Sequence, residues 1–400
     1  MIKVKNIVIV GASHAAVETI ASLRKLGWKD SITLVGDESI LPYQRPPLSK
    51  GYLKGEIASE KLALRHPDFY KKNTVDLRLG HKATSIDRSA KLIQLDNGDI
   101  IKYDKLILAT GTRPKYLSVE GCNLPQIKYL RTLADVDLIR ESIHADTRLL
   151  VIGAGYIGLE VAASAIKQKA QVTIIEYLDR VLARVAGKEI SDFYQKLHMN
   201  HGVDIQLNSS VIGFKEQNGR CLATLNNDNQ IDFDCAVVGI GVEPNTELAE
   251  NAGLKCNNGI AVDEYTLTND SDIHAIGDCS NHPNFIYNTR VRLESVPNAV
   301  AQAKTAANYI CGDKKAYDQV PWFWSDQYDI KLQTVGLSHG YDETIIKGNI
   351  EDKKFTVAYL KEGQMIALDA INSPKDFIEA KKIIGDNEFS TLRLPSDQVR

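Results

Sequence analysis

Two glycine-rich turns are the parts of this chain whose residue types and spacing point most directly to chemistry. The stretch LLVIGAGYIGLEV carries a complete G-x-G-x-x-G pattern at Gly153, Gly155 and Gly158. The first glycine of such a pattern permits a tight turn, the second lets the backbone approach a pyrophosphate, and the third lets a helix pack closely on a strand. The helix N-terminus then offers oriented N–H groups to the phosphates. The pattern therefore predicts a dinucleotide site rather than a simple packing corner.

The acidic residue that follows this turn indicates which dinucleotide would bind. The apolar stretch QVTIIE ends at Glu176, about 20 residues after the glycines, where a carboxylate accepts hydrogen bonds from a ribose diol. The same carboxylate would repel the 2′-phosphate of NADP, and no arginine stands beside it. Arg184 could reach the adenosine end, or it could be a solvated surface charge. We therefore expect NADH rather than NADPH.

An earlier stretch, VIVGASHAAVETI, repeats the plan with two departures from the pattern. Gly11 keeps the first position, whereas Ser13 and Ala16 replace the second and third glycines. Ser13 is small and its hydroxyl could donate to a phosphate, and Ala16 adds only one methyl group at the helix–strand contact. The next apolar stretch, SITLVGD, ends at Asp37, which suits a ribose. We interpret this copy as a second nucleotide site, with His14 as a bystander near the turn.

Each turn needs a buried strand before it, a helix after it and a second strand that ends in an acid, and both copies supply this order. Each copy is followed by a stretch of one form, a buried strand that runs into a Gly/Pro turn: YDKLILATGTRP after the first and FDCAVVGIGVEPN after the second. Another short strand is expected in DIHAIGDCS, and strand-like alternation in residues 328–400. The chain is therefore predicted to be an α/β protein with two nucleotide-binding modules.

Composition excludes several other classes of protein. The 400 residues suggest two or three domains, and 48 basic against 51 acidic residues argue against nucleic-acid binding. No apolar run reaches the roughly 18 residues of a membrane span, so no membrane association is expected. The opening MIKVKNIVIVG is better interpreted as a first strand than as a signal peptide, which predicts a cytoplasmic protein. Six scattered cysteines have no metal-type spacing, so we expect free thiols and no metal site.

Seven stretches in order along the chain carry a family resemblance: LPYQRPPLSKGYL, YDKLILATGTRP, YLRT, GAGYIGLEVA, AIGDC, ESVPNA and PWFWSDQY. Together they resemble the FAD-dependent NADH:ferredoxin reductases of bacterial oxygenase systems, of the putidaredoxin reductase type, over about residues 4 to 345. The resemblance implies a glutathione-reductase-like fold with two Rossmann-like domains and a C-terminal α+β interface domain. The implied FAD-binding domain covers residues 1–115 and 246–322, the NAD-binding domain 116–245 and the C-terminal domain 323–400.

The resemblance also implies a set of site residues. Those expected to contact FAD are Gly11, Ser13, His14, Ala15, Asp37, Arg45, Lys50, Ala83, Ala109, Thr110, Gly111, Arg131, Asp278, Val296 and Trp324. Those expected to flank the nicotinamide are Tyr156, Ile157, Gly241 and Glu294. Lys50 and Glu160 are expected to pair beside the flavin as the catalytic residues, although either could be a surface charge. A positive charge there would stabilise the reduced flavin anion.

The implied reaction is hydride transfer from NADH to FAD, followed by single-electron transfer to a [2Fe–2S] ferredoxin that supplies a cytochrome or Rieske-type oxygenase. The iron–sulfur cluster would belong to the partner, because this chain has no cysteine set to hold one. A disulfide or peroxide reductase would need a cysteine soon after the first module's second strand, and GDESILPYQRPPLSKGYL has none. A rubredoxin reductase and an NADH-sensing flavoprotein remain as alternatives.

Overall fold

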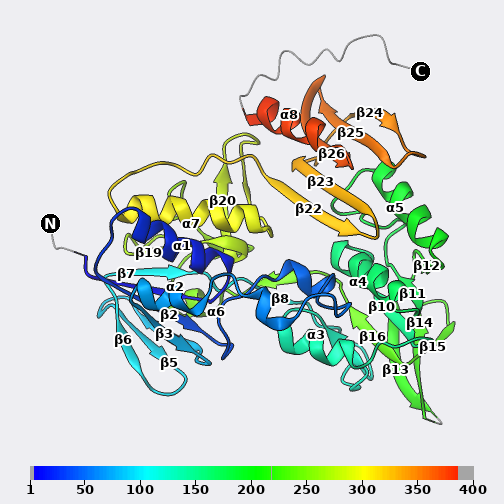
Figure 1. Ribbon diagram of the computed structural model, residues 1–400, viewed down its shortest axis with the longest axis horizontal. Helices are drawn as coiled ribbons and strands as arrows, with labels where there is room; N and C mark the ends of the chain where they lie inside the picture. The colour runs from blue at the N-terminus through cyan, green and yellow to red at the C-terminus, as the bar shows by residue number, and fades with distance from the viewer. Residues whose placement is uncertain (1–3, 218, 386–400) are drawn as a thin grey trace. The chain divides into compact units, whose positions relative to one another are not determined.

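The computed structural model describes residues 4–217 and 219–385. The chain divides into two compact units, which we call unit 1 and unit 2 (Figure 1). Unit 1 comprises Met1–Gln44, Glu60–Arg113 and Glu243–Pro321. Unit 2 comprises Arg45–Ser59, Pro114–Val242 and Trp322–Arg400. Two of the crossings between the units fall within short strands, β8 (Thr112–Pro114) and β17 (Val242–Pro244).

The core of unit 1 is a five-stranded parallel sheet. Its strands, in spatial order, are β19 (Ile273–Ala275), β7 (Lys105–Leu108), β1 (Asn6–Val10), β2 (Ser31–Gly36) and β3 (Val75–Leu79). Strand β1 is almost entirely buried, as expected of a β-branched strand covered on both faces. Its alternate residues enter different clusters, so Ile7 and Ile9 pack with the helices and Val8 and Val10 pack on the opposite side.

Three helices cover one face of this sheet, and a short helix and smaller sheets complete unit 1. The three helices are α1 (His14–Lys25), α2 (Pro67–Lys72) and α7 (Val296–Ile310), and α1 packs mainly against α7. The short helix α6 (Glu247–Asn251) packs in the cluster on the opposite face. An antiparallel sheet contains β4 (Ala83–Asp87), β5 (Leu92–Leu95) and β6 (Ile100–Lys102). A mixed sheet contains β18 (Ile260–Ala261), which runs parallel to β20 (Ser280–Asn284), and β21 (Thr289–Val291), which runs antiparallel to β20. The short 3-10 helices are η2 (Ser59–Leu62) and η3 (Gly277–Cys279).

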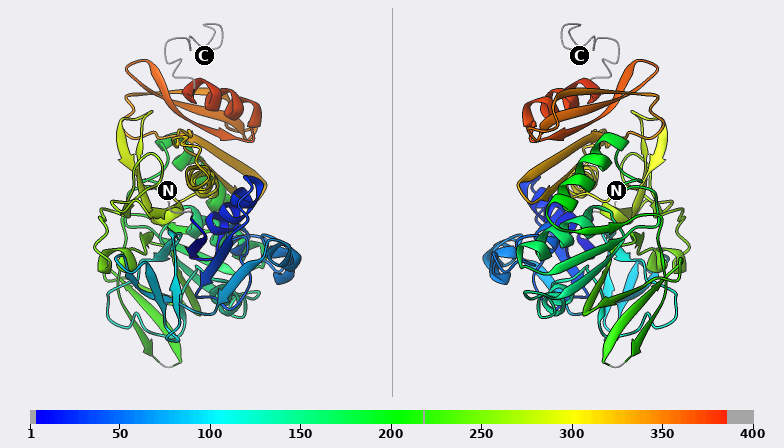
Figure 2. Two further views of the ribbon diagram at one scale, coloured as in Figure 1. Left: turned by 90° about the vertical axis from the view of Figure 1, so that its left-hand side faces the viewer. Right: turned by 90° about the vertical axis from the view of Figure 1, so that its right-hand side faces the viewer.

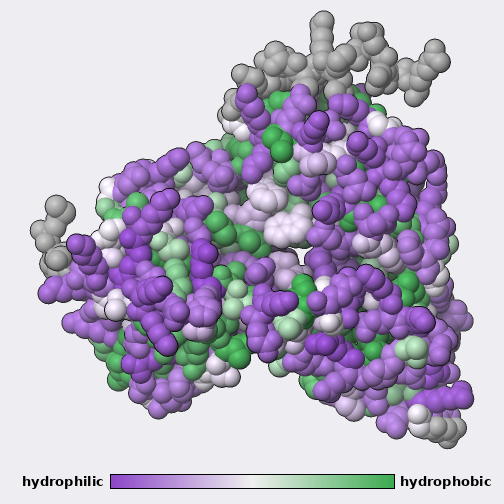
Figure 3. All heavy atoms as spheres, viewed as in Figure 1, coloured by the Kyte–Doolittle hydropathy of each residue, from purple (hydrophilic) through white to green (hydrophobic). Residues whose placement is uncertain are grey.

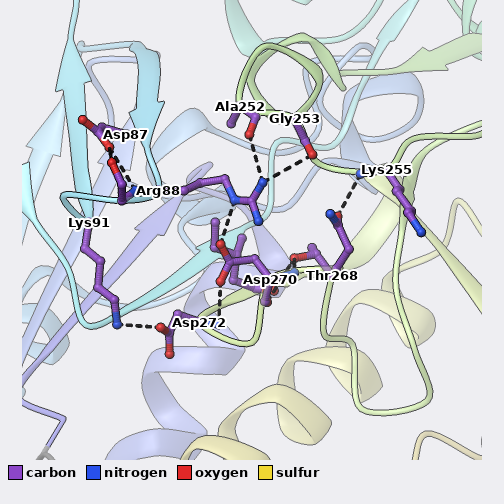
Figure 4. A network of polar contacts seen from close by, with 12 residues as sticks. Asp87, Arg88, Lys91, Ala252, Gly253, Lys255, Thr268, Asp270 and Asp272 are labelled. Atoms are coloured by element: carbon purple, nitrogen blue, oxygen red, sulfur yellow. Dashed lines mark hydrogen bonds and ion pairs between the residues drawn. The ribbon is translucent and has the colours of Figure 1, made fainter.

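Ion pairs tie together the parts of unit 1 that are distant in sequence (Figure 4). The Arg88 guanidinium, which follows β4, lies 2.7 Å from the Asp270 carboxylate and also reaches the carbonyls that end α6. Lys91 and Lys105 both pair with Asp272, at 2.5 and 2.7 Å. These contacts fasten the segment that carries β19 to the N-terminal part of the sheet. The discontinuous module therefore folds as one body.

Unit 2 contains a second five-stranded parallel sheet. Its strands, in spatial order, are β12 (Asp204–Gln206), β11 (Gln171–Ile175), β10 (Arg148–Ile152), β16 (Cys235–Val238) and β9 (Ile127–Tyr129). The helices around it are α3 (Leu133–Arg140), α4 (Tyr156–Lys167) and α5 (Lys188–Asn200), and α4 packs directly on β10 and β11. An antiparallel sheet follows, with β13 (Val211–Gln217), β14 (Arg220–Leu225) and β15 (Gln230–Phe233).

The rest of unit 2 is an antiparallel sheet with one helix on it. The strands, in spatial order, are β22 (Trp322–Gln327), β23 (Ile330–Gly336), β26 (Gln364–Ile371), β25 (Lys354–Lys361) and β24 (Glu343–Asn349). Helix α8 (Pro374–Gly385), drawn in red in Figure 2, packs on β23 and β26. The sequence predicted these strands but not α8. The end of that prediction, residues 386–400, lies outside the described residues.

The two predicted strand–turn–helix modules are both present, because each glycine turn joins a central parallel strand to a helix. The exact domain boundaries stay a prediction. Within the described ranges no helix is long and apolar enough to cross a bilayer, and no group of acidic, histidine or cysteine side chains could hold a metal ion. All six cysteines are free. The face drawn in Figure 3 is mainly hydrophilic, with apolar residues in small patches.

Candidate functional site

The glycine turn of unit 2 is shaped by close backbone contacts. Gly153 directly follows β10 and has a φ of +102°, and its N–H donates to the Ile175 carbonyl at 2.8 Å. A Cβ on Gly153 would lie 2.5 Å from the Gly239 oxygen, and a Cβ on Gly158 would lie 2.0 Å from the Gly153 oxygen. Both positions therefore require glycine. A Cβ on Gly155 would meet nothing within 4 Å, so this glycine leaves open space in front of the turn.

The helices that follow the two turns begin without a side-chain cap. Neither Ser13 before α1 nor Gly155 before α4 accepts a hydrogen bond from its helix through a side chain, and neither helix has an acid in its first turn. Helix α3 differs, since Thr132 and Asp135 form a complete capping box. At a helix N-terminus the first-turn N–H groups have no intrahelical carbonyl to bond, and the helix dipole adds a partial positive charge. Both N-termini therefore fit the pyrophosphate of a dinucleotide.

Glu176, the predicted ribose acceptor, lies against the turn of unit 2. It directly follows β11, and its Oε2 accepts a hydrogen bond from the Ala154 N–H at 2.6 Å. Its Oε1 accepts another from the Leu178 N–H at 2.9 Å. Because Ala154 stands between the first two glycines, the carboxylate lies directly beside the turn that is predicted to hold a pyrophosphate. The ribose contact itself stays a prediction.

Two further predicted residues of unit 2 meet beside the same sheet. Arg184 donates through Nη2 to the Ile240 carbonyl at 3.5 Å, and a Cβ on Gly241 would lie 3.4 Å from its Nη1. Gly241 has a φ of +110°, which favours glycine. Ile157, at the start of α4, is 44% exposed. The predicted nucleotide residues of unit 2 therefore gather around the ends of β10, β11 and β16.

The glycine turn of unit 1 has nearly the same backbone geometry. Gly11 has a φ of +106°, and its N–H donates to the Val35 carbonyl at 2.8 Å. A Cβ on Gly11 would lie 2.1 Å from the Ala109 oxygen. Ala16 is fully buried in the helix-side core, and Asp37 follows β2 in an exposed position. The turn therefore needs its first glycine but accommodates a methyl group at the third position.

The predicted flavin residues divide between the two units. Unit 1 contains Gly11, Ser13, His14, Ala15, Asp37, Ala83, Ala109, Thr110, Gly111, Asp278 and Val296. Unit 2 contains Arg45, Lys50, Arg131 and Trp324, and there Arg45 donates to the Arg131 carbonyl at 2.8 Å. Within unit 1, Ala83 is buried in β4 and Thr110 donates to the Asn245 carbonyl at 2.8 Å. Glu294, predicted to flank the nicotinamide, lies in unit 1 and pairs with Arg292 at 2.6 Å.

Lys50 and Glu160 form the expected ion pair in unit 2. Lys50 follows the 3-10 helix η1 (Pro46–Ser49), and its Nζ lies 2.7 Å from Glu160 Oε2. Glu160 is only 2% exposed, whereas Lys50 is 19% exposed. Ser49 donates to Glu160 Oε2 at 2.5 Å and Ser325 to Oε1 at 2.6 Å. Three donors therefore compensate the burial of this carboxylate, as a buried charge requires.

Aromatic side chains lie at the start of α4 and on β22. The Tyr156 ring lies 4.8 Å from that of Phe323, and Trp324 lies 5.8 Å from Trp322 between ring centres. Burial raises the pKa of Tyr156 well above its ordinary value, so the phenol stays neutral. Tyr156, the first residue of α4, therefore packs its ring against β22 and keeps its phenol neutral.

Sequence reasoning missed some residues that the structure joins to this ion pair. Ser49 lies within PPLSK, and Ser325 and Gln327 lie within PWFWSDQY, so these motifs contained the only signal for them. Gln327 in turn contacts His198 of α5. Nothing in the sequence around His198 distinguishes it from any other buried helical residue. Spatial neighbours that are distant in sequence were therefore the hardest residues to predict.

Comparison with known proteins places this geometry in a family. Residues 5–303 match the family described as pyridine nucleotide-disulphide oxidoreductase, and residues 322–398 match the reductase C-terminal family. The chain is 43% identical to putidaredoxin reductase of Pseudomonas putida over 387 residues. This match covers 95% of this chain and 92% of that protein. It is also 43% identical over 380 residues to rhodocoxin reductase of Rhodococcus erythropolis, covering 95% and 89%.

A solved structure agrees with these similarities. The crystal structure of the covalent putidaredoxin reductase–putidaredoxin complex superposes with a TM-score of 0.93 at 42% identity, covering 98% of this chain and 97% of that one. The predicted fold class is therefore confirmed: two Rossmann-like modules with a C-terminal antiparallel-sheet domain, a glutathione-reductase-like fold.

Proposed function

The chain belongs to the pyridine nucleotide-disulphide oxidoreductase family, and membership of this family implies that FAD and NAD(P)H are the cofactors. We propose that the protein is an NADH-dependent ferredoxin reductase. The observation that supports this most strongly lies on one helix, α4. Its uncapped N-terminus carries the complete glycine turn, and Glu160 on the same helix binds Lys50. A single rigid element therefore links the predicted hydride-donor site to the predicted flavin-side charge.

The residues of this chain would bind, orient and tune the two cofactors. Bound FAD supplies the chemistry, since it accepts a hydride and releases electrons one at a time. The N-termini of α1 and α4 would hold the pyrophosphates of FAD and NADH respectively. Lys50 and Glu160 would act as the catalytic pair: Glu160 would fix Lys50 in position, and Lys50 would supply the positive charge that favours reduced flavin. Asp37 and Glu176 would bind the two adenosine riboses.

We assign the remaining predicted site residues to supporting contacts. Around FAD these are Ser13, His14, Ala15, Arg45, Ala83, Ala109, Thr110, Gly111, Arg131, Asp278, Val296 and Trp324. Around the pyridine nucleotide these are Tyr156, Ile157, Arg184, Gly241 and Glu294. The FAD-binding domain would comprise residues 1–115 and 246–322, the NAD-binding domain 116–245 and the C-terminal domain 323–400.

The proposed electron acceptor is a small [2Fe–2S] ferredoxin that serves a cytochrome or Rieske-type oxygenase. The solved relative was crystallised covalently bound to putidaredoxin, which supports a partner of this kind. The cluster would belong to the partner, because the six cysteines of this chain are scattered, free and mostly at least partly buried. Free thiols also suit the reducing conditions of the cytoplasm, where we expect the protein to work.

The test is anaerobic mixing of the flavoprotein with NADH, followed by turnover with purified carriers. Enzymes typically turn over at about 1–1,000 per second, so flavin bleaching is expected within about a second. Bleaching over many seconds, with no ferredoxin-dependent turnover, would instead identify an NADH-sensing flavoprotein. Faster turnover with rubredoxin than with every [2Fe–2S] ferredoxin would identify a rubredoxin reductase. Equal rates with NADPH would contradict the predicted role of Glu176.

A further inference from the structure

A continuous chain of hydrogen bonds, buried except for its last bond, leads away from the Lys50–Glu160 pair within unit 2. Ser325 donates to Glu160 Oε1 at 2.6 Å, and Gln327 Nε2 donates to Ser325 Oγ at 3.2 Å. Gln327 Oε1 lies 2.8 Å from His198 Nε2, and His198 Nδ1 lies 3.0 Å from the Tyr328 hydroxyl. Ser325, Gln327 and His198 are at most 1% exposed. We call Ser325, Gln327, His198 and Tyr328 the relay.

The ionised carboxylate gives every bond of the relay one direction. Glu160 can only accept, so Ser325 must use its single hydrogen to donate to it. The Ser325 oxygen then accepts from the amide nitrogen of Gln327, which turns the amide oxygen toward the His198 ring. This orientation requires a proton on His198 Nε2 and leaves Nδ1 as an acceptor.

The far end of the relay is consistent with this direction. Burial lowers the pKa of His198 to about 4, so the imidazole is neutral at pH 7 and carries one proton. Tyr328 therefore donates its hydroxyl hydrogen to His198 Nδ1 and selects the tautomer with the proton on Nε2. Every donor of the relay thus points along the chain toward Glu160.

Backbone geometry at Tyr328 supports a role beyond filling space. Tyr328 begins the two-residue turn between β22 and β23 with a φ of +55°, a position where asparagine, aspartate or glycine is usual. A bulky residue in this conformation is strained and persists where surrounding contacts stabilise it. Here the ring stacks on His201, with centres 3.8 Å apart and planes 13° apart. The strained turn places the hydroxyl on His198.

We propose that Ser325, Gln327, His198 and Tyr328 are positioning residues, which orient the Glu160 carboxylate so that it holds Lys50 at one place for flavin reduction. This inference rests on the proposed function, since it takes Lys50 to act beside the flavin. If Gln327 or Tyr328 is replaced, the Ser325 oxygen loses its oriented amide donor, and the Ser325 hydroxyl is free to rotate away from Glu160. Glu160 Oε1 then loses its donor, the uncompensated negative charge grows, and the flavin becomes harder to reduce.

The test compares three variants of the FAD-loaded protein: Ser325→Ala, Gln327→Leu and Tyr328→Phe. Hydrogen bonds to charged groups are stronger than those between neutral groups, so Ser325→Ala is expected to slow flavin reduction at saturating NADH by about 10-fold or more. Gln327→Leu and Tyr328→Phe act through Ser325 and are expected to slow it by about 3-fold each, a fraction of that single-bond effect. The dissociation constant for NADH should stay unchanged, and the flavin midpoint potential should fall in the same order.

Tyr359→Phe is the matched control for loss of stability. Tyr359 lies in the same sheet and donates to the buried Asp369 carboxylate at 2.6 Å, outside the relay. It should lower the melting temperature and leave the rate and potential unchanged. If the relay variants also change only the melting temperature, the proposal is wrong. The flavin midpoint potential is measured with a chemical reductant and needs no ferredoxin. If the unmodified protein fails to reduce ferredoxin, the proposed function is contradicted, but the role of the relay is still decided by the potentials of the variants.

Discussion

The two glycine turns share a backbone but differ in what their helices pack against. Gly11 and Gly153 have almost equal positive φ angles and both lie against the backbone of a neighbouring parallel strand. At the third position of the pattern, unit 2 needs Gly158, whereas unit 1 accepts the buried Ala16. Helix α4 packs directly on β10 and β11, while the main partner of α1 is α7. The third glycine is therefore required by close helix–strand packing and not by nucleotide binding alone.

The second position of the glycine pattern, Ser13 in unit 1 and Gly155 in unit 2, differs in its side chain and not in its packing. Ser13 and Gly155 both have extended backbone and neither caps its helix. A side chain at this position points toward the ligand space, because a Cβ on Gly155 would meet no protein atom within 4 Å. We interpret the turn with Ser13 as the one for resident FAD and the turn with Gly155 as the one for transient NADH. The predictions below test this contrast.

The largest effect is expected from Gly158→Val. Its Cβ would overlap the Gly153 carbonyl, and neither backbone can move without separating α4 from β10. Strain of this kind should cost roughly 3–5 kcal/mol in the free energy of unfolding, at the upper end of single substitutions. Urea unfolding of the purified protein measures it. A loss below about 1 kcal/mol, the average for a point substitution, would show that the helix can shift and would remove the packing argument.

Glu176→Arg should change cofactor choice while leaving the fold intact. The substitution removes an acceptor for the ribose of NADH and adds a cation that favours the 2′-phosphate of NADPH. If the lost contact and the gained contact are each worth about 1.4 kcal/mol, the NADH to NADPH ratio of kcat/KM changes by about 100-fold. Steady-state kinetics with both nucleotides measures the ratio. Asp37→Asn in the other turn is the control, expected to weaken FAD retention without altering the ratio. An unchanged ratio in Glu176→Arg would rule out the ribose role.

Gly155→Ala should weaken NADH binding with little effect on stability. The added methyl group enters open space in the free protein but occupies the region where a pyrophosphate would approach. We expect the dissociation constant for NADH to rise about 10-fold, or about 1.4 kcal/mol. The unfolding free energy should change by less than about 0.5 kcal/mol, as for a surface substitution. Ser13→Ala is the matched variant, and the same loss of NADH affinity there would contradict the assignment of the two turns.

Much of this architecture could be predicted because the signal was local. The order of strand, glycine turn, helix, strand and acid lies within about 30 residues in each copy, and hydrophobic patterning identifies such units well. The pairing of Lys50 with Glu160 came only from the family resemblance, since the two are 110 residues apart. The relay could not be predicted, because His198 meets Gln327 through tertiary packing that no local pattern encodes. Helix α8 was not predicted, because the strand-like alternation of polar and apolar residues before it was taken to continue to the end of the chain.

The smallest effect is expected from Ala16→Gly, which restores the complete glycine pattern in unit 1. If the third glycine served binding, this change should tighten FAD retention. If it serves packing, as we argue, the change removes a buried methyl group and adds backbone freedom to α1 at a site that never needed glycine. The free energy of unfolding should then fall by about 1 kcal/mol, the usual helix cost of glycine relative to alanine. Thermal unfolding and the FAD dissociation constant distinguish the outcomes. A more stable protein that binds FAD more tightly would show that the third position favours glycine in both turns.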